Sequence, residues 1–315
     1  YHTFTDNEIF SIIQQELEFY EKILDEIKPD YVFIRNPEYQ DIQLFYEICK
    51  AKKISVLVLS FTRLSDRWTL SSDVDTPISL DNLDEKIEIK SFDDLKEFGK
   101  KYSKIHDLYI PKQKSNLLQK MNVLKTVFFT FNSSNINNYR DVGKTAWKAI
   151  VKRIELLLNS FFREQFLNKK AEKIISKNCP YAYFPLHFEP ESIILTRAKF
   201  YTEQISVIKN ISQSLPIDMF LFVKEHPAMK LVGWRNLNFY KAIMKMPNVK
   251  LIHPSISNET IIQNSTIITT IAGTTAIEAA FYEKSSIVFT DVNFSTLSCV
   301  FTIKNLEELP VIIKK

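Results

Sequence analysis

Residues 266–282 read TIITTIAGTTAIEAAFY, and this stretch decides the fold class of the chain. The apolar, β-branched run at 266–271 favours a strand, and the residues after Gly273 favour a helix over 274–282. The chain has only 4 glycines in 315 residues, so a glycine at this junction indicates a place where the backbone needs one. The segment therefore predicts a strand that turns directly into a helix.

The same alternation continues on both sides of this stretch. We expect strands at 181–184, 219–223, 249–252, 266–271, 286–289 and 299–303, and helices at 197–214, 238–246, 258–264, 274–282 and 306–313. Strands that alternate with helices form a parallel sheet with helices on both faces. The second half of the chain is therefore predicted to be a Rossmann-like α/β domain.

The first half of the chain predicts one parallel crossover unit. It consists of a helix at 6–28, opened by a Thr5 and Glu8 capping box, a strand at 31–34, a helix at 40–52 and a strand at 54–59. One such unit does not cover both faces of a sheet, and the sequence begins at Tyr1, so we expect an incomplete N-terminal domain. The predicted domains are 1–175, with a helical linker or insertion at 85–175, and 176–315.

Composition narrows the functional classes. The chain has 45% hydrophobic residues and a net charge of +4 without a basic arm, which argues against nucleic-acid binding. Its 3 cysteines are far apart, and neither a long apolar run nor a signal peptide is evident. No metal-ligand motif, P-loop or GxGxxG is present. We expect a cytoplasmic protein, peripheral at most at the inner face of the cytoplasmic membrane, with no metal and no cofactor.

Polar residues that directly follow predicted strands are the candidate site, because ligands of open parallel sheets bind at the carboxyl ends of the strands. The first such loop is 185–191, where His187 lies near Glu189 and Glu191. Two carboxylates near a histidine suit acid–base work or a ribose, or they form a solvated loop. In the N-terminal half, Arg63 and Arg67 follow a strand and either reach an interdomain cleft or belong to a surface loop.

The second loop is Lys224-Glu225-His226-Pro227. His226 is placed to donate a hydrogen bond to a phosphate, with Lys224 and Glu225 beside it. A lone histidine is more often structural than functional, and in this context both interpretations stay open. A charged run directly after a buried strand is costly unless it faces a cleft, which favours a functional interpretation here.

The third loop is the one quoted at the start. Gly273 would aim the first N–H groups of the following helix, with the hydroxyls of Thr274 and Thr275, at an anion. Glu278 lies one turn after Thr274, where its carboxylate can accept hydrogen bonds from a ribose. The alternative is an ordinary helix cap with a solvent-facing glutamate. Thr270, near the end of the preceding strand, belongs to the same candidate site.

The ordered set of these motifs resembles the capsular polysaccharide biosynthesis proteins, whose relatives include the Kdo transferases of capsule assembly. The similarity runs over about residues 181–310 and is carried by YFPLHFEPE at 183–191, VKEHP at 223–227, NFY at 238–240, PNV at 247–249 and AGTTAIEA at 272–279. Residues 30–68 resemble the family more loosely.

The resemblance implies a GT-B glycosyltransferase fold, in which two Rossmann-like domains face a central cleft. It also implies that His226-Pro227 and Thr274-Thr275 contact a nucleotide-sugar donor, with a CMP-sugar such as CMP-Kdo as one candidate. The expected catalytic residues are His226, Glu225 and Glu189, and the expected partners are the donor, a glycan or glycolipid acceptor and a membrane-bound polysaccharide assembly complex. Two alternatives remain: a sugar-nucleotide epimerase of the UDP-GlcNAc 2-epimerase type, and a non-catalytic module with the same fold.

Overall fold

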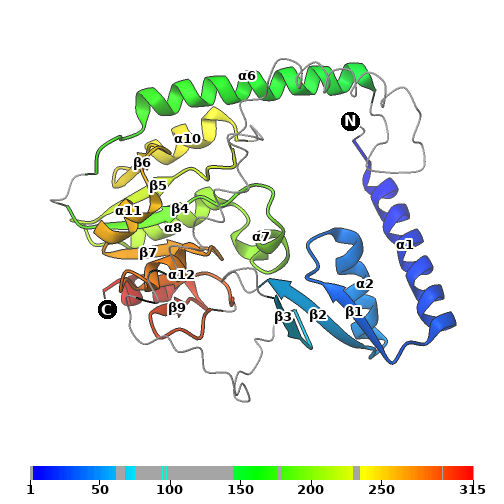
Figure 1. Cartoon of the computed structure of the whole chain (residues 1–315). Helices are drawn as coiled ribbons and strands as arrows, with labels where there is room; N and C mark the ends of the chain where they lie inside the picture. The colour runs from blue at the N-terminus through cyan, green and yellow to red at the C-terminus, as the bar shows by residue number, and fades with distance from the viewer. Residues whose placement is uncertain are drawn as a thin grey trace.

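The computed structural model describes residues 3–61, 68–74, 94, 97, 145–175, 179–229, 235–292 and 294–314. These residues form two α/β units, each built on its own sheet (Figure 1). The α/β class and the two units with parallel strands, predicted from the sequence, are confirmed.

The C-terminal unit contains a six-stranded sheet in the order β6-β5-β4-β7-β8-β9. Every neighbouring pair of its strands is parallel. The strands are β4 (Tyr181–Pro185), β5 (Phe220–Lys224), β6 (Val249–Ile252), β7 (Ile267–Thr270), β8 (Ser286–Val288) and β9 (Val300–Thr302). All six lie within a residue or two of the predicted strands.

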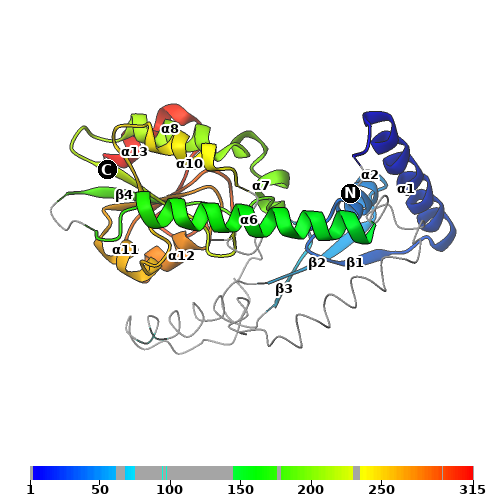
Figure 2. The ribbon, with the colours of Figure 1, turned by 90° about the horizontal axis from the view of Figure 1, so that it is seen from above.

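Helices cover both faces of this sheet (Figure 2). They are α7 (Ser192–Thr196), α8 (Gln204–Ser214), α10 (Leu237–Met244), α11 (Asn258–Asn264), α12 (Thr275–Ala280) and α13 (Leu309–Ile313), with short 3₁₀ turns η2 (Lys199–Tyr201) and η3 (Leu306–Glu308). One buried cluster joins α8, α10 and α13 to one face of the sheet, and a second joins α11 and α12 to the other. Because both faces are buried, the strands are continuous apolar runs.

One predicted helix is divided. Residues 197–214, predicted as a single helix, form η2 and α8, with non-helical backbone at Ala198 (φ −112°, ψ 45°) and extended backbone at Glu203. Helix α7, which comes just before this segment, was not predicted. The C-terminal helix predicted at 306–313 likewise begins as η3, and α13 then starts with a proline at its first turn, where a missing N–H costs nothing.

The N-terminal unit has a three-stranded sheet in the order β1-β2-β3. Its elements are α1 (Asp6–Ile27), β1 (Tyr31–Arg35), α2 (Gln40–Ala51), β2 (Ser55–Phe61) and β3 (Trp68–Ser71). The predicted crossover is confirmed, since β1 and β2 are parallel, as is the Thr5 and Glu8 capping box. The antiparallel strand β3 was not predicted, because it is only four residues long and its apolar residues are few.

Helix α6 (Ala146–Lys170) leads into the C-terminal unit and extends away from it in both views (Figures 1 and 2). It lies in the predicted helical segment 85–175; of residues 85–144, only Asp94 and Glu97 are among the described residues. None of the described helices is long and apolar enough to cross a membrane.

Arg197 joins the two units. Its guanidinium donates to the Asn36 side chain (3.3 Å) and to the Val74 carbonyl (3.0 Å). Asn36 directly follows β1, and Arg197 directly follows α7, which comes after β4. The carboxyl end of β1 therefore lies against the part of the C-terminal unit that follows its central strand.

Candidate functional site

The strand order places the candidate site at a topological switch point. From β4 the chain proceeds to β5 and β6 on one side of the sheet, and then returns to β7, β8 and β9 on the other. The loops after β4 and β7 therefore diverge from adjacent strands, which is where open α/β sheets bind their ligands. Two of the three predicted loops, 185–191 and 272–275, follow these two strands, and the third follows the neighbouring β5.

His187 ties the two switch-point loops together. Its Nδ1 lies 2.8 Å from a carboxylate oxygen of Glu191, and its Nε2 lies 3.0 Å from the Thr270 hydroxyl. The Ala272 N–H also donates to Nε2, over 3.4 Å. These partners fit the tautomer with its proton on Nδ1, donated to Glu191. His187 itself is buried, so its contacts shape the site from inside rather than face a ligand.

Gly273 is required by close approach. A Cβ atom at this position would lie 2.5 Å from the Thr270 hydroxyl oxygen and 3.4 Å from Cε1 of His187. The Gly273 N–H donates to that same hydroxyl, over 3.1 Å. The φ angle of Gly273 is not in the left-handed region. The backbone need inferred from sequence is thus steric: the turn presses against Thr270 and leaves no room for a side chain.

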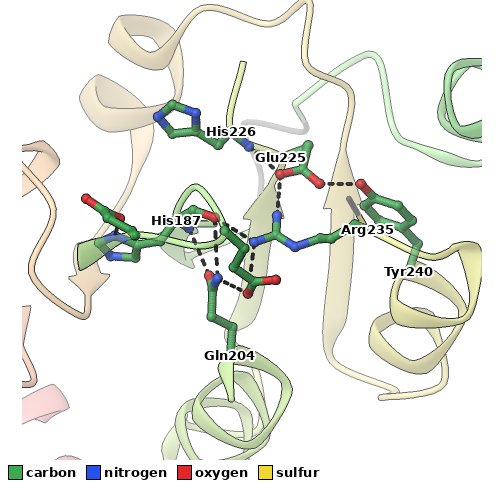
Figure 3. A network of polar contacts seen from close by, with 8 residues as sticks. His187, Gln204, Glu225, His226, Arg235 and Tyr240 are labelled. Carbon is green, nitrogen blue, oxygen red and sulfur yellow. Dashed lines mark hydrogen bonds and ion pairs between the residues drawn. The ribbon is translucent and has the colours of Figure 1, made fainter. Parts of the chain in front are cut away.

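A second network of buried polar contacts surrounds Arg235 (Figure 3). Its guanidinium donates to Glu225, to Glu189 over 3.1 Å and to the His187 carbonyl over 2.5 Å. The Tyr240 hydroxyl donates to the second oxygen of Glu225. Glu225 and Arg235 are 3% and 5% exposed, so this ion pair belongs to the interior.

The electrostatics of this network favour the charged pair. Burial would lower the pKa of Arg235, but Glu225 and Glu189 outweigh it and raise that pKa. Burial and the carboxylate of Glu225 together raise the pKa of Tyr240, so its hydroxyl stays a donor. Desolvated charges are tolerated inside a protein when they are paired, as here, although the Nε of Arg235 has no hydrogen-bond partner among the described residues. The network holds the β4 and β5 loops in fixed positions relative to each other.

Gln204 completes the framework. At the start of α8, its side-chain oxygen accepts from the His187 N–H (2.8 Å), and its amide donates to the His187 carbonyl (3.3 Å) and to Glu189. Sequence reasoning missed Gln204 and Arg235. A glutamine in the first turn of a helix carries no functional signal, and the Arg235–Glu225 pair forms only through tertiary folding.

His226 differs from its neighbours. Its backbone N–H donates to Glu225 (2.7 Å), but its imidazole points away from the network (Figure 3). The ring is partly buried, lies edge-on to Phe188 at a centroid distance of 6.0 Å, and accepts the Ala228 N–H at Nδ1 (3.2 Å). That contact leaves Nε2 as the nitrogen that carries the proton in the neutral ring. The next residue, Pro227, is exposed.

Lys224, the last residue of β5, and Glu278 of α12 influence each other electrostatically. The Lys224 ammonium is buried and donates to the Ile256 carbonyl and to Asn258, each over 2.6 Å. Burial lowers the pKa of Lys224 to about 8, against an opposing effect of Glu278. Burial likewise raises the pKa of Glu278 to about 7, and Lys224 opposes this. The carboxyl of Glu278 is therefore poised to change charge near neutral pH.

The remaining predicted residues lie as follows. Thr274 is partly buried and precedes α12 with no side-chain cap, whereas Thr275 is buried within the first turn of this six-residue helix. Arg63 and Arg67 lie outside the described residues. Over the described ranges, no group of three or more His, Cys, Asp or Glu side chains is arranged to hold a metal ion.

Comparisons with known proteins give only distant similarity. No protein-family model and no curated protein matches the sequence. Thermosulfurimonas dismutans KpsC, a beta Kdo 2,7 transferase, aligns at 9% identity and a TM-score of 0.42 over 98% of this chain and 80% of that one. The UDP-GlcNAc 2-epimerase of Methanocaldococcus jannaschii aligns at 13% identity and a TM-score of 0.34 over 99% and 76%.

A second T. dismutans KpsC structure, a beta Kdo 2,4 transferase, aligns at 14% identity and a TM-score of 0.34 over 49% of this chain and 50% of that one. Similarity at this level carries no argument about activity. The parallel α/β fold and its switch point rest on the chain's own strand order, and these transferases and the epimerase are proteins that it resembles in outline.

Proposed function

We propose that this chain is a metal-independent glycosyltransferase of the GT-B type that binds a nucleotide-sugar donor at the switch point of its C-terminal sheet. The observation that carries the proposal is the contact of the β4 and β7 loops, which His187, Thr270 and Gly273 hold together where α/β sheets bind ligands. Two of the motifs that resemble capsular polysaccharide biosynthesis proteins, at 183–191 and 272–279, lie at these same loops and support it.

In this proposal His226 and the Thr274-Thr275 turn stabilise the leaving nucleotide. When the bond between the sugar and the phosphate oxygen breaks, negative charge grows on that phosphate, and a preorganised donor there lowers the barrier. The Nε2 of His226 is such a donor, and Lys224 adds positive charge behind it. The acceptor hydroxyl forms the new bond and releases its proton to a base, which we place across the cleft in the N-terminal unit.

Glu278 is the proposed ribose ligand, whereas three other glutamates and one histidine take positioning roles. Glu225, Glu189, Glu191 and His187 all engage buried or partly buried protein partners. We therefore assign Glu225 and Glu189, expected from sequence to be catalytic, to the framework that fixes the loops. The carboxylate of Glu225 is buried and paired with Arg235, so it is not available to a substrate proton, and Glu189 is held by both Arg235 and Gln204.

The proposed donor is a CMP-linked sugar such as CMP-Kdo, following the sequence resemblance. The proposed acceptor is a growing surface polysaccharide or glycolipid, reached through peripheral association with a membrane-bound assembly complex. An epimerase acting on a nucleotide sugar is the second candidate. It is favoured by the side chains of Glu189 and Glu191, which remain 34% and 28% exposed at the switch point, where acid–base chemistry on a sugar would need them.

A binding panel and a product assay test the proposal together. We expect CMP to raise the melting temperature of the chain more than UDP or GDP, because ligands that bind only the folded state stabilise it. Incubation of a CMP-sugar with a glycan acceptor should give a lengthened glycan, and His226→Ala should abolish this product without lowering the melting temperature. If the nucleotide sugar is epimerised in the absence of an acceptor, the chain is an epimerase and not a transferase. Nucleotide binding without either product would indicate a non-catalytic module with the same fold.

A further inference from the structure

Helix α6 exposes a continuous apolar face. Its large apolar side chains with high exposure are Trp147 (72%), Val151 (46%), Ile154 (52%), Leu157 (56%), Leu158 (52%), Phe161 (55%) and Phe162 (55%). At 100° per residue they span an arc of about 140° on one side of the helix, and from Trp147 to Phe162 they extend over about 23 Å. Scattered apolar residues on a surface are ordinary, but a contiguous stripe of this size marks an interaction surface.

This face points away from the protein body. The buried residues of α6 are Arg163 (4% exposed) and Leu167 (5%), and they lie on roughly the opposite side of the helix from Ile154 and Leu158. Leu167 packs in a cluster with Tyr240 and Leu251 of the C-terminal unit. The last turns of α6 thus anchor the helix, and among the described residues nothing covers the apolar stripe.

The charges of α6 indicate the nature of that partner. Its basic residues are Lys148, Lys152, Arg153, Arg163, Lys169 and Lys170, against the acidic residues Glu155 and Glu164. Lys148 and Arg153 lie about 40° beyond the two edges of the apolar arc, with Glu155 on the side of Lys148 and Glu164, three turns further along, on the side of Arg153. The basic residues outnumber these two glutamates. Long basic side chains that flank an apolar face can reach lipid phosphates while the face enters the acyl boundary.

We propose that the α6 stripe, the seven apolar residues named above, docks the protein on the surface of an anionic lipid bilayer. The helix lies in the plane of the interface and does not cross the membrane, in agreement with its length and charge. A second copy of the chain fits the stripe less well, because two such helices would bring their basic flanks together. The proposal does not depend on the glycosyltransferase assignment, although it would bring the site close to a lipid-linked acceptor.

The C-terminal end of α6, which packs on the C-terminal unit, also contacts the candidate site. Phe166 packs beside Tyr240, with ring centroids 6.1 Å apart, and the Tyr240 hydroxyl donates to Glu225. A membrane-bound α6 would therefore hold the β5 loop at a set orientation to the lipid surface.

Cosedimentation of the full chain with vesicles tests this surface. We expect binding to phosphatidylcholine vesicles that contain about one third phosphatidylglycerol, and much weaker binding to pure phosphatidylcholine. The double variant Ile154→Gln/Leu158→Gln should weaken binding about tenfold or more, because it removes buried apolar area. The matched control Phe200→Gln/Ile217→Gln, at positions that are 97% and 105% exposed on the C-terminal unit, should bind like the wild type.

Two charge-reversal variants distinguish a lipid partner from a protein partner. Lys148→Glu/Arg153→Glu should abolish the preference for phosphatidylglycerol, whereas Lys199→Glu/Lys209→Glu, with the same change in net charge, should retain it. The proposal would be overturned if the wild type did not bind the phosphatidylglycerol vesicles, or if the Ile154→Gln/Leu158→Gln variant bound them as well as the wild type does. A wild-type dimer in light scattering that this variant dissociates, with lipid binding unchanged, would assign the stripe to a second copy. Circular dichroism confirms that each variant is folded.

Discussion

At the residue scale, the site depends on the contact between Gly273 and Thr270. The two residues come from one turn, and the Gly273 N–H, the Thr270 hydroxyl and Nε2 of His187 form one chain of contacts. A methyl group at position 273 would lie 2.5 Å from the Thr270 oxygen, a separation that real Cβ atoms do not adopt. The rarity of glycine in this sequence thus has a local steric cause.

Gly273→Ala should therefore destabilise the chain by about 1–3 kcal/mol through overpacking and should weaken nucleotide binding. The clash is with a single oxygen, so adding Thr270→Ala should recover part of that loss. Urea unfolding of the two single variants and the double variant gives the coupling energy between the positions. Losses that simply add in the double variant would contradict the contact described here.

Glu278 should make the free energy of unfolding depend on pH. Its folded-state pKa is raised from 4.5 to about 7 by burial, against the effect of Lys224. Between these values the unfolded chain releases the proton while the folded chain keeps it, so the stabilising contribution present at low pH is lost as pH rises towards 7. Relative to Glu278→Gln, the wild type should lose about 2 kcal/mol of unfolding free energy between pH 5 and pH 7.5.

Urea unfolding at several pH values measures this difference. Glu307→Gln, at an exposed carboxylate outside the site, is the matched control and should keep a constant offset from the wild type. A constant offset for Glu278→Gln as well would show that its carboxyl is not buried in the way described.

At the element scale, the packing of α6 against the C-terminal unit depends on few residues. Leu167 is 5% exposed in a small cluster, whereas Leu157 on the same helix is 56% exposed. Leu167→Ala should cost about 2–4 kcal/mol and speed hydrogen exchange of the last turns of α6, because a cavity opens where the helix meets the C-terminal unit. Leu157→Ala should change the unfolding free energy by less than about 0.5 kcal/mol. Similar costs at the two positions would contradict the assignment of buried and exposed sides.

Most elements of the C-terminal unit could be predicted from the sequence because its strands are buried on both faces. Each is an apolar run between polar loops, as at Phe220–Lys224, and the residues that follow it come to the carboxyl edge of the sheet. The break at Ala198 and the strand β3 could not be predicted, because tertiary contacts decide them. The same holds for the Arg235–Glu225 pair, whose members are ten residues apart in the sequence, with nothing in the pattern to connect them.

At the scale of the whole molecule, Arg197 links the two units. Its guanidinium reaches Asn36 and Val74, while its carbonyl accepts from the Thr290 hydroxyl. If the acceptor and the base are on the N-terminal unit, this link sets the distance over which the sugar is transferred. Arg197→Ala should therefore lower kcat of the transfer reaction severalfold and leave the Kd for the nucleotide unchanged. Equal losses in binding and turnover would instead place Arg197 at the donor itself.

A nucleotide should bind where the β4 and β7 loops diverge. Hydrogen exchange of the full chain, measured with and without CMP, tests it most directly. We predict protection in three segments, 186–191, 225–229 and 271–278, with weaker protection when Gly273 is replaced by alanine. Unchanged exchange in all three segments with every one of CMP, UDP and GDP, or protection confined to the N-terminal unit, would contradict the claim.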